Sequence, residues 1–157
     1  MELNKPRYAK FIILIEGIQK SIQKLKLAKA KSLGIKSVHI FWLSHLLYTT
    51  RGLTASELAR GSMVDRSLVS REIEELISRG LVVVSGGRRY VLTEEGRRLA
   101  AEIGEMVEAV QSEVNLGIDD GELDMFYSTL EKMYENFTTV TTVVKKSKNN
   151  TEGEIDS

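Results

Sequence analysis

The sequence predicts a mainly α fold that carries one small β-hairpin. Segments near both ends of the chain repeat apolar residues at helical spacing. Between them lie two short helical patterns separated by a turn, then a β-branched run, a pair of glycines and a second short run typical of two antiparallel strands. A length of 157 residues suits one compact domain, or a small domain with additional packing helices.

The first helix is expected to begin at Pro6 and to end at Gly34. Its apolar residues recur at steps of four, three, four and three, which is a heptad spacing; they are Phe11, Ile15, Ile18, Ile22 and Leu25. In a second helix around residues 38–48, apolar residues nearly fill one side, so we expect this helix to be fully buried.

A helix-turn-helix follows. Thr54 and Glu57 form a capping box that predicts a short helix over residues 55–60, and Gly61 is expected to end it and to allow a tight turn. Asp65 is expected to cap the second helix, which Gly80 closes. The core face of that helix is formed by Val69, Ile73, Leu76 and Ile77, and the opposite face by Ser67, Ser70, Arg71 and Glu74, with Arg66 in the first turn.

A hairpin and two further helices complete the expected fold. Residues 81–85 and 88–92 are predicted strands joined by a two-residue turn at Gly86 and Gly87. Thr93 caps a long helix, and Asp119 with Glu122 forms a capping box that opens the last one. These two helices carry further apolar seams. From Lys145 onward the apolar pattern ends, so residues 145–157 are expected to be a disordered tail.

Charge is distributed unevenly along the chain. Residues 1–50 carry a net charge of +7, residues 51–98 of +2 and residues 99–157 of −9. Nine of the ten arginines lie in the middle stretch, which contains no lysine. Arginine's rigid donor fork suits phosphates and guanine edges, so this pattern favours DNA as the partner. The alternative is that long exposed helices segregate charge without any functional role.

The order of these elements, with the motifs LTASELARGSMVDRSLVSREIEELISRGLV and LTEEGRRLA, resembles the MarR family of bacterial winged-helix transcription regulators. The resemblance covers roughly residues 8–140. It implies a homodimer, held by its first and last helices, that binds double-stranded DNA at a pseudo-palindromic operator, with repression as the expected action and a small-molecule effector as modulator. The implied regions are 6–34 and 99–144 for helical dimerisation and 35–98 for the winged helix-turn-helix.

Six residues are the candidate DNA contacts: Arg66, Ser67, Ser70 and Arg71 on the second helix, and Arg88 and Arg89 in the wing. Small serines allow a helix to approach base edges while arginine reaches them. The wing departs from the family because SGGRR joins its strands directly and lacks the family's aspartate, so phosphate contacts are expected there. The alternative is that Arg88 and Arg89 are ordinary exposed strand residues without a role in DNA binding. Glu72, Glu74 and Glu75 are expected to weaken the positive field of the helix.

The apolar seams also predict self-association. A winged helix over residues 35–95 cannot cover the seams of the first helix and the last two, and a symmetric homodimer would. An intramolecular helical bundle is the alternative.

Several other function classes lack sequence support. The chain has no cysteine, and no nucleophile, phosphate-loop or cofactor motif is present, so neither an enzyme nor a cofactor is expected. His39 and His45 fall on different faces of one helix and suit a core or an interface better than a metal site. No apolar run predicts a membrane span, and a cytoplasmic location is expected. The alternative to DNA binding is a winged helix that serves only as a protein-interaction module.

Overall fold

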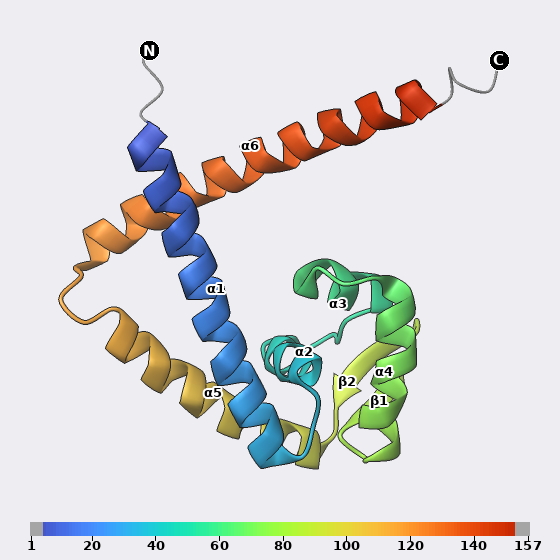
Figure 1. Cartoon of the computed structure of the whole chain (residues 1–157). Helices are drawn as coiled ribbons and strands as arrows, with labels where there is room; N and C mark the ends of the chain where they lie inside the picture. The colour runs from blue at the N-terminus through green and yellow to red at the C-terminus, as the bar shows by residue number, and fades with distance from the viewer. Residues whose placement is uncertain (1–4, 153–157) are drawn as a thin grey trace. The chain divides into compact units, whose positions relative to one another are not determined.

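A computed structural model describes the backbone of residues 5–152 and the side chains of residues 6–144. This part of the chain is mainly helical with one antiparallel hairpin, which confirms the predicted fold class (Figure 1). The elements in chain order are α1 (Lys5–Leu33), α2 (Ser37–Leu47), α3 (Ala55–Ser62), α4 (Arg66–Ser78), β1 (Val82–Ser85), β2 (Arg89–Leu92), α5 (Glu94–Val114) and α6 (Asp120–Glu152).

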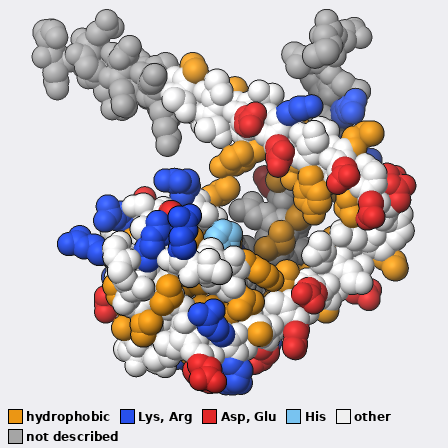
Figure 2. Space-filling view, turned by 180° about the vertical axis from the view of Figure 1, so that it is seen from behind, with side chains coloured by type: hydrophobic (Ala, Val, Ile, Leu, Met, Phe, Trp, Pro, Cys, Tyr) orange, Lys and Arg blue, Asp and Glu red, His pale blue; other side chains and the backbone are white. Residues whose placement is uncertain are grey.

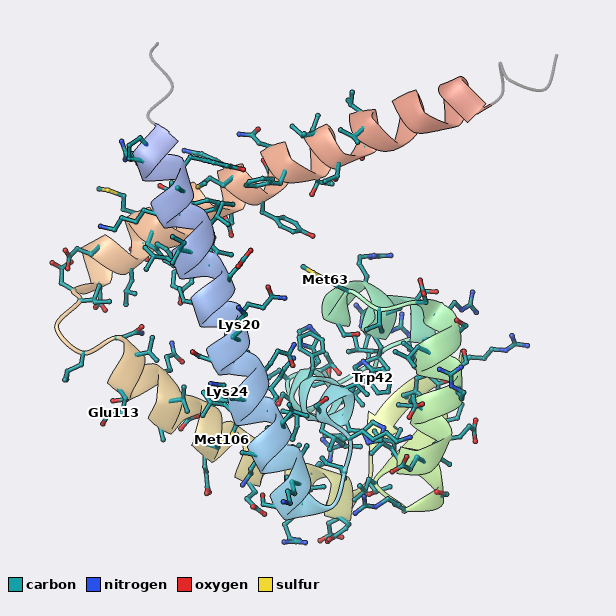
Figure 3. All side chains as sticks on the ribbon, viewed as in Figure 1. Lys20, Lys24, Trp42, Met63, Met106 and Glu113 are labelled. Atoms are coloured by element: carbon teal, nitrogen blue, oxygen red, sulfur yellow. The ribbon has the colours of Figure 1, made fainter. Side chains whose placement is uncertain are left out.

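The chain forms two compact units, residues 1–109 and residues 110–157. The first unit contains the helix-turn-helix, the hairpin and most of α5. Its core is built around α2, whose Trp42 and Leu43 are fully buried. Trp42, labelled in Figure 3, connects α2 to α3, because its Nε1 donates a hydrogen bond to Ser62 Oγ at 3.0 Å. Five residues of α2 are buried and His45 is exposed, so the expected full burial of this helix is confirmed only in part.

The core face predicted for α4 is also confirmed. Val69, Ile73 and Leu76 are fully buried, and Ile77 packs half-buried against the same core. From α5, Leu99, Ala100 and Ile103 complete the cluster. The opposite face of α4 is thereby fixed towards solvent.

The end of α3 differs from the prediction. Gly61 lies inside the helix, which continues to Ser62, and Met63 adopts the left-handed conformation that ends it, with φ of 55°. A Cβ atom at Gly61 would lie 3.2 Å from the Phe41 ring. The glycine therefore allows α3 to pack closely on α2, a demand that its local sequence does not reveal.

The helix caps are only partly as expected. Thr54 and Glu57 form the predicted capping box, with Glu57 N donating to Thr54 Oγ1 at 3.2 Å and Thr54 N donating to Glu57 Oε2 at 2.7 Å. Asp65 occupies the N-cap position of α4 but makes no side-chain cap bond. Its expected role as a side-chain cap is therefore wrong.

The wing turns through three residues. Ser85 pairs with Arg89, so Gly86, Gly87 and Arg88 all lie in the loop, and the predicted two-residue turn is wrong. Gly87 and Arg88 both have positive φ, of 73° and 58°. A positive φ is unfavourable for arginine. Arg88 therefore belongs to the loop and not to strand β2, in which it was predicted to lie.

The second unit contains the end of α5, a connection and α6. Asp119 and Glu122 form the predicted capping box, with bonds of 2.9 and 3.1 Å. Between residues 110 and 144 no side chain is buried. Helix α6 continues to Glu152. The disordered tail expected over residues 145–157 stays a prediction. Residues 153–157 of the expected tail lie outside the described part.

None of the described helices combines the length and the apolar character needed to cross a membrane.

Candidate nucleic-acid interface

Four of the predicted site residues share the exposed surface of α4. Arg66, Ser67, Ser70 and Arg71 are all exposed at its N-terminal half. Ser70 Oγ donates to the Arg66 carbonyl at 3.1 Å, which folds this hydroxyl against its own helix. The Ser70 hydroxyl therefore projects little, and an approaching surface would come close to the helix backbone while the arginines extend past it.

Arg71 retains most of its hydrogen-bonding capacity. Its Nε lies 3.5 Å from Glu72 Oε1, and the Arg71 side chain is 70% exposed, so this ion pair contributes little to the stability of the fold. No ion pair within the described residues engages its two terminal nitrogens. The outer edge of the guanidinium is thus available for a planar, two-bond contact of the kind arginine makes with guanine.

Two of the three glutamates on α4 are already paired inside the protein. Lys36 Nζ lies 2.5 Å from Glu72 Oε2 and 2.9 Å from Glu75 Oε2. The Lys36 hydrogen bonds lower the pKa of both carboxyls and raise the pKa of Lys36. Glu74 alone among the three is exposed. The expected weakening of the positive field is therefore smaller than a count of acidic residues suggests.

The structure separates the two arginines of the wing. Arg88 is exposed in the loop between the strands. Arg89 is half-buried, and its Nη1 donates to the Gly52 carbonyl at 2.9 Å and to Glu57 Oε2 at 3.1 Å. Arg89 therefore joins the wing to α3, a role that the sequence interpretation did not assign to it.

The segment before α3 reinforces this junction. Leu53 and Tyr90 exchange two backbone hydrogen bonds, of 3.0 and 2.8 Å, which adds an isolated bridge beside β2. Gly52 has φ of 70°, and a Cβ atom there would overlap the Tyr90 carbonyl oxygen. The bridge thus requires glycine at position 52. Sequence reasoning missed it because a single bridge has no strand-like pattern.

Basic side chains gather over α3 and α4 on one face of the first unit (Figure 2). The described arginines of these two helices and of the wing loop that are exposed are Arg60, Arg66, Arg71 and Arg88. Such a grouping is the electrostatic pattern expected of a surface that binds a phosphate backbone.

The two histidines have different environments. His39 is fully buried, as expected for a core residue, and burial lowers its pKa. His45 is exposed and stacks on Phe41 with ring centroids 4.5 Å apart. An imidazole nitrogen of His39 and carboxylate oxygens of Glu72 and Glu75 lie within 4.8 Å of one another. Sequence reasoning did not find this cluster because its members lie far apart along the chain.

No protein-family model and no curated protein matches the sequence, but solved structures do. A transcriptional regulator of the MarR family from Silicibacter pomeroyi is 26% identical, with a TM-score of 0.70 over 87% of this chain and 96% of that one. The transcriptional regulator PA3341 is also 26% identical, with a TM-score of 0.72 over 82% and 98%.

A third neighbour is a putative MarR family transcriptional regulator from Listeria monocytogenes, solved as a complex with 26mer DNA. It is 22% identical and has a TM-score of 0.74 over 86% of this chain and 93% of that one. All three neighbours are described as transcriptional regulators, the class of protein that the sequence motifs resemble. In its motifs and its fold the chain is similar to winged-helix transcriptional regulators of the MarR family.

Proposed function

We propose that this chain regulates transcription by binding double-stranded DNA in a sequence-specific manner through α4. The observation that carries the proposal is the exposed surface formed by Arg66, Ser67, Ser70 and Arg71 at the N-terminal half of one helix. The DNA complex of the Listeria monocytogenes neighbour supports it, because that protein has the same fold.

In the proposed complex, α4 enters the major groove and Arg71 contacts a guanine edge with two hydrogen bonds. Arg88 approaches a phosphate from the wing loop, because it is exposed there. Arg89 positions the wing, since Gly52 and Glu57 already occupy its guanidinium.

We also propose a homodimer. Helix α1 exposes Ile18 and Ile22 by about half, at 51% and 50%. In the second unit, Met125, Phe126 and Tyr134 of α6 are each at least half exposed. Apolar surface of this extent on long helices is typical of protein interfaces, and a symmetric dimer covers it with a second copy of the same surface.

Two copies of α4 in a symmetric dimer imply a pseudo-palindromic operator. Its half-sites would lie one helical turn apart, about 34 Å. A dimer bound across a promoter would block transcription, so we propose that the chain acts as a repressor. We propose the cytoplasm as its location.

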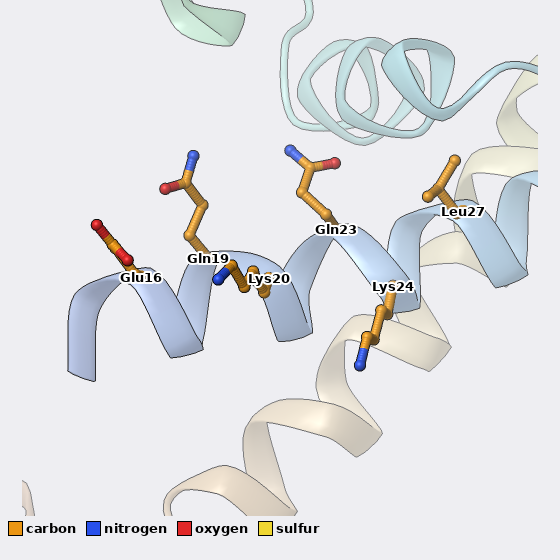
Figure 4. Close-up of a pocket in the computed structure, with 6 residues that line it drawn as sticks. All are labelled: Glu16, Gln19, Lys20, Gln23, Lys24 and Leu27. Carbon is orange, nitrogen blue, oxygen red and sulfur yellow. The ribbon is translucent and has the colours of Figure 1, made fainter. Parts of the chain in front are cut away.

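A small organic effector is a further part of the proposal. A shallow hollow runs along α1 (Figure 4). It is lined by Glu16, Gln19, Lys20, Gln23, Lys24 and Leu27. The lining combines two lysines, two amides, one apolar side chain and the carboxylate of Glu16, and its two lysines suit the acid group of an amphipathic aromatic carboxylate. Such a compound is expected to weaken DNA binding in a fluorescence titration, and Lys20→Ala should reduce its effect.

Selection of duplexes from a random library by the purified full chain tests the function. The proposal expects an enriched palindromic motif. The alternative is a protein-interaction module. Such a module would enrich no sequence and would bind the selected duplexes no more tightly than a scrambled duplex. Only that outcome would favour the alternative, because both functions share the fold and the dimer.

A further inference from the structure

The cluster formed by His39, Glu72 and Glu75 lies between α2 and α4. One imidazole nitrogen and one oxygen from each carboxylate lie within 4.8 Å of one another. Among the described residues, His39 Nε2 is the one buried side-chain nitrogen or oxygen without a hydrogen-bond partner. His39 itself has no exposed surface. A buried polar atom of this kind is rare, because folding removes the water molecules that would otherwise hydrogen-bond to it.

We propose that His39, Glu72 and Glu75 bind a divalent transition metal ion, with Zn²⁺ as the probe. Imidazole nitrogen and carboxylate oxygen are ligands that zinc takes at about 2.0–2.2 Å, so small side-chain rotations from the present spacing would suffice. Three protein ligands leave a fourth position for water. The carboxylates come from adjacent turns of α4, since they are three residues apart.

In this structure the ammonium group of Lys36 lies beside the two carboxylates, where the metal ion would bind. Its ammonium lies 2.5 Å from Glu72 and 2.9 Å from Glu75, and 55% of its side chain is exposed. The ammonium can therefore move into solvent when an ion with two positive charges takes its place between the carboxylates. Metal and Lys36 compete for the same oxygens, which gives the proposal a distinctive test.

The proton on His39 must move for this exchange. Its Nδ1 accepts a hydrogen bond from Lys36 N at 3.3 Å, which places the proton of the neutral ring on Nε2. Coordination through Nε2 transfers that proton to Nδ1 and breaks the long hydrogen bond from Lys36 N. The imidazole stays neutral throughout, so no net proton is released.

Ligands from two helices would make the ion a cross-link. His39 belongs to α2, in the core, and the glutamates belong to α4. An ion bound here would link α4 to α2 on the side of α4 opposite its exposed face. Metal binding itself does not depend on the proposed DNA function, so the two can fail separately.

Titration of the metal-free full chain with Zn²⁺, against a chromophoric chelator as competitor, tests the site. We expect one ion per chain. Glu75→Gln and, as a second variant, Glu72→Gln should each weaken binding at least about tenfold, as expected when a metal ligand is removed. Lys36→Ala should tighten binding because the competing ammonium is gone. Circular dichroism would confirm that each variant is folded.

Two matched controls decide between this site and adventitious binding. Glu74→Gln removes a neighbouring carboxylate of α4, and His45→Gln removes the exposed histidine of α2. Both should leave the affinity unchanged. Weakening by His45→Gln with no change in the Glu72 and Glu75 variants, or a loss of affinity in Lys36→Ala, would overturn the proposal. Zinc should also raise the melting temperature of the wild type but not of Glu75→Gln.

Discussion

The carboxylate of Glu57 connects Arg89 of the wing to the first turn of α3. Its Oε2 accepts a hydrogen bond from Thr54 N at 2.7 Å and another from Arg89 Nη1 at 3.1 Å. One side chain thus closes the capping box of α3 and fixes the returning strand of the hairpin. The orientation of the wing relative to the helix-turn-helix depends on this connection.

Arg89→Ala should therefore weaken the fold of the wing. The variant loses a hydrogen bond to the Gly52 carbonyl and a partly exposed ion pair, together about 1 kcal/mol of unfolding free energy. Because Arg89 makes no phosphate contact in our account, the salt dependence of DNA binding should keep its slope. Urea unfolding and DNA titrations across salt would measure both effects.

Arg88→Ala is the matched comparison in the wing loop. It should leave the unfolding free energy nearly unchanged. The salt slope should fall by about one unit for each phosphate that the variant no longer neutralises, hence about two per dimer. A reversed result, with the slope reduced by Arg89→Ala alone, would restore Arg89 as the residue that binds phosphate.

Acid should destabilise the first unit through Glu57. The hydrogen bond from Thr54 N, more than Arg89, lowers the pKa of Glu57 below its usual value of 4.5. A depressed folded pKa contributes stability that is complete above the unfolded pKa and is lost as the pH falls through the folded pKa. Glu57→Gln should reduce the dependence of the urea midpoint on pH below about 4.5. Parallel curves for wild type and variant would contradict this role.

Local patterns predicted the elements of the fold, but not the contacts between them. The apolar spacing of Val69, Ile73 and Leu76 fixes which face of α4 is buried, and it therefore also placed Arg71 outside. The pairing of Lys36 with Glu72 depends on how α2 approaches α4, which no local pattern contains. The prediction that Gly61 ends α3 was wrong because Gly61 lies inside the helix, close to the Phe41 ring, and Met63 forms the cap that ends it.

Gly52→Ala should destabilise the protein by at least about 2 kcal/mol. The position has φ of 70°, and the new Cβ would overlap a backbone oxygen of Tyr90 that cannot rotate away. Gly17→Ala is the opposite case, because it lies within α1 with open space around it. It should stabilise α1 by about 0.5–1 kcal/mol. Thermal unfolding of the two variants would measure the expected loss of stability in one and the expected gain in the other.

Charged substitutions on α1 should separate the proposed dimer. Wild type is expected to show twice its chain mass of 17.6 kDa by light scattering at micromolar concentration. Ile18→Glu and Ile22→Glu place charges on half-exposed apolar positions and should shift the mass towards the monomer. Gln19→Glu, on the same helix, is the control. A monomeric wild type would remove the argument for a palindromic operator.

Titration of Arg71→Ala on a selected operator and on a scrambled duplex tests most directly the claim that α4 reads base edges. Arg71 is exposed, and its outer nitrogens make no ion pair among the described residues. We expect a loss of about 1–3 kcal/mol in binding free energy on the operator, relaxed preference at one position of each half-site and a much smaller loss on the scrambled duplex. An equal loss on both duplexes would contradict base reading by Arg71.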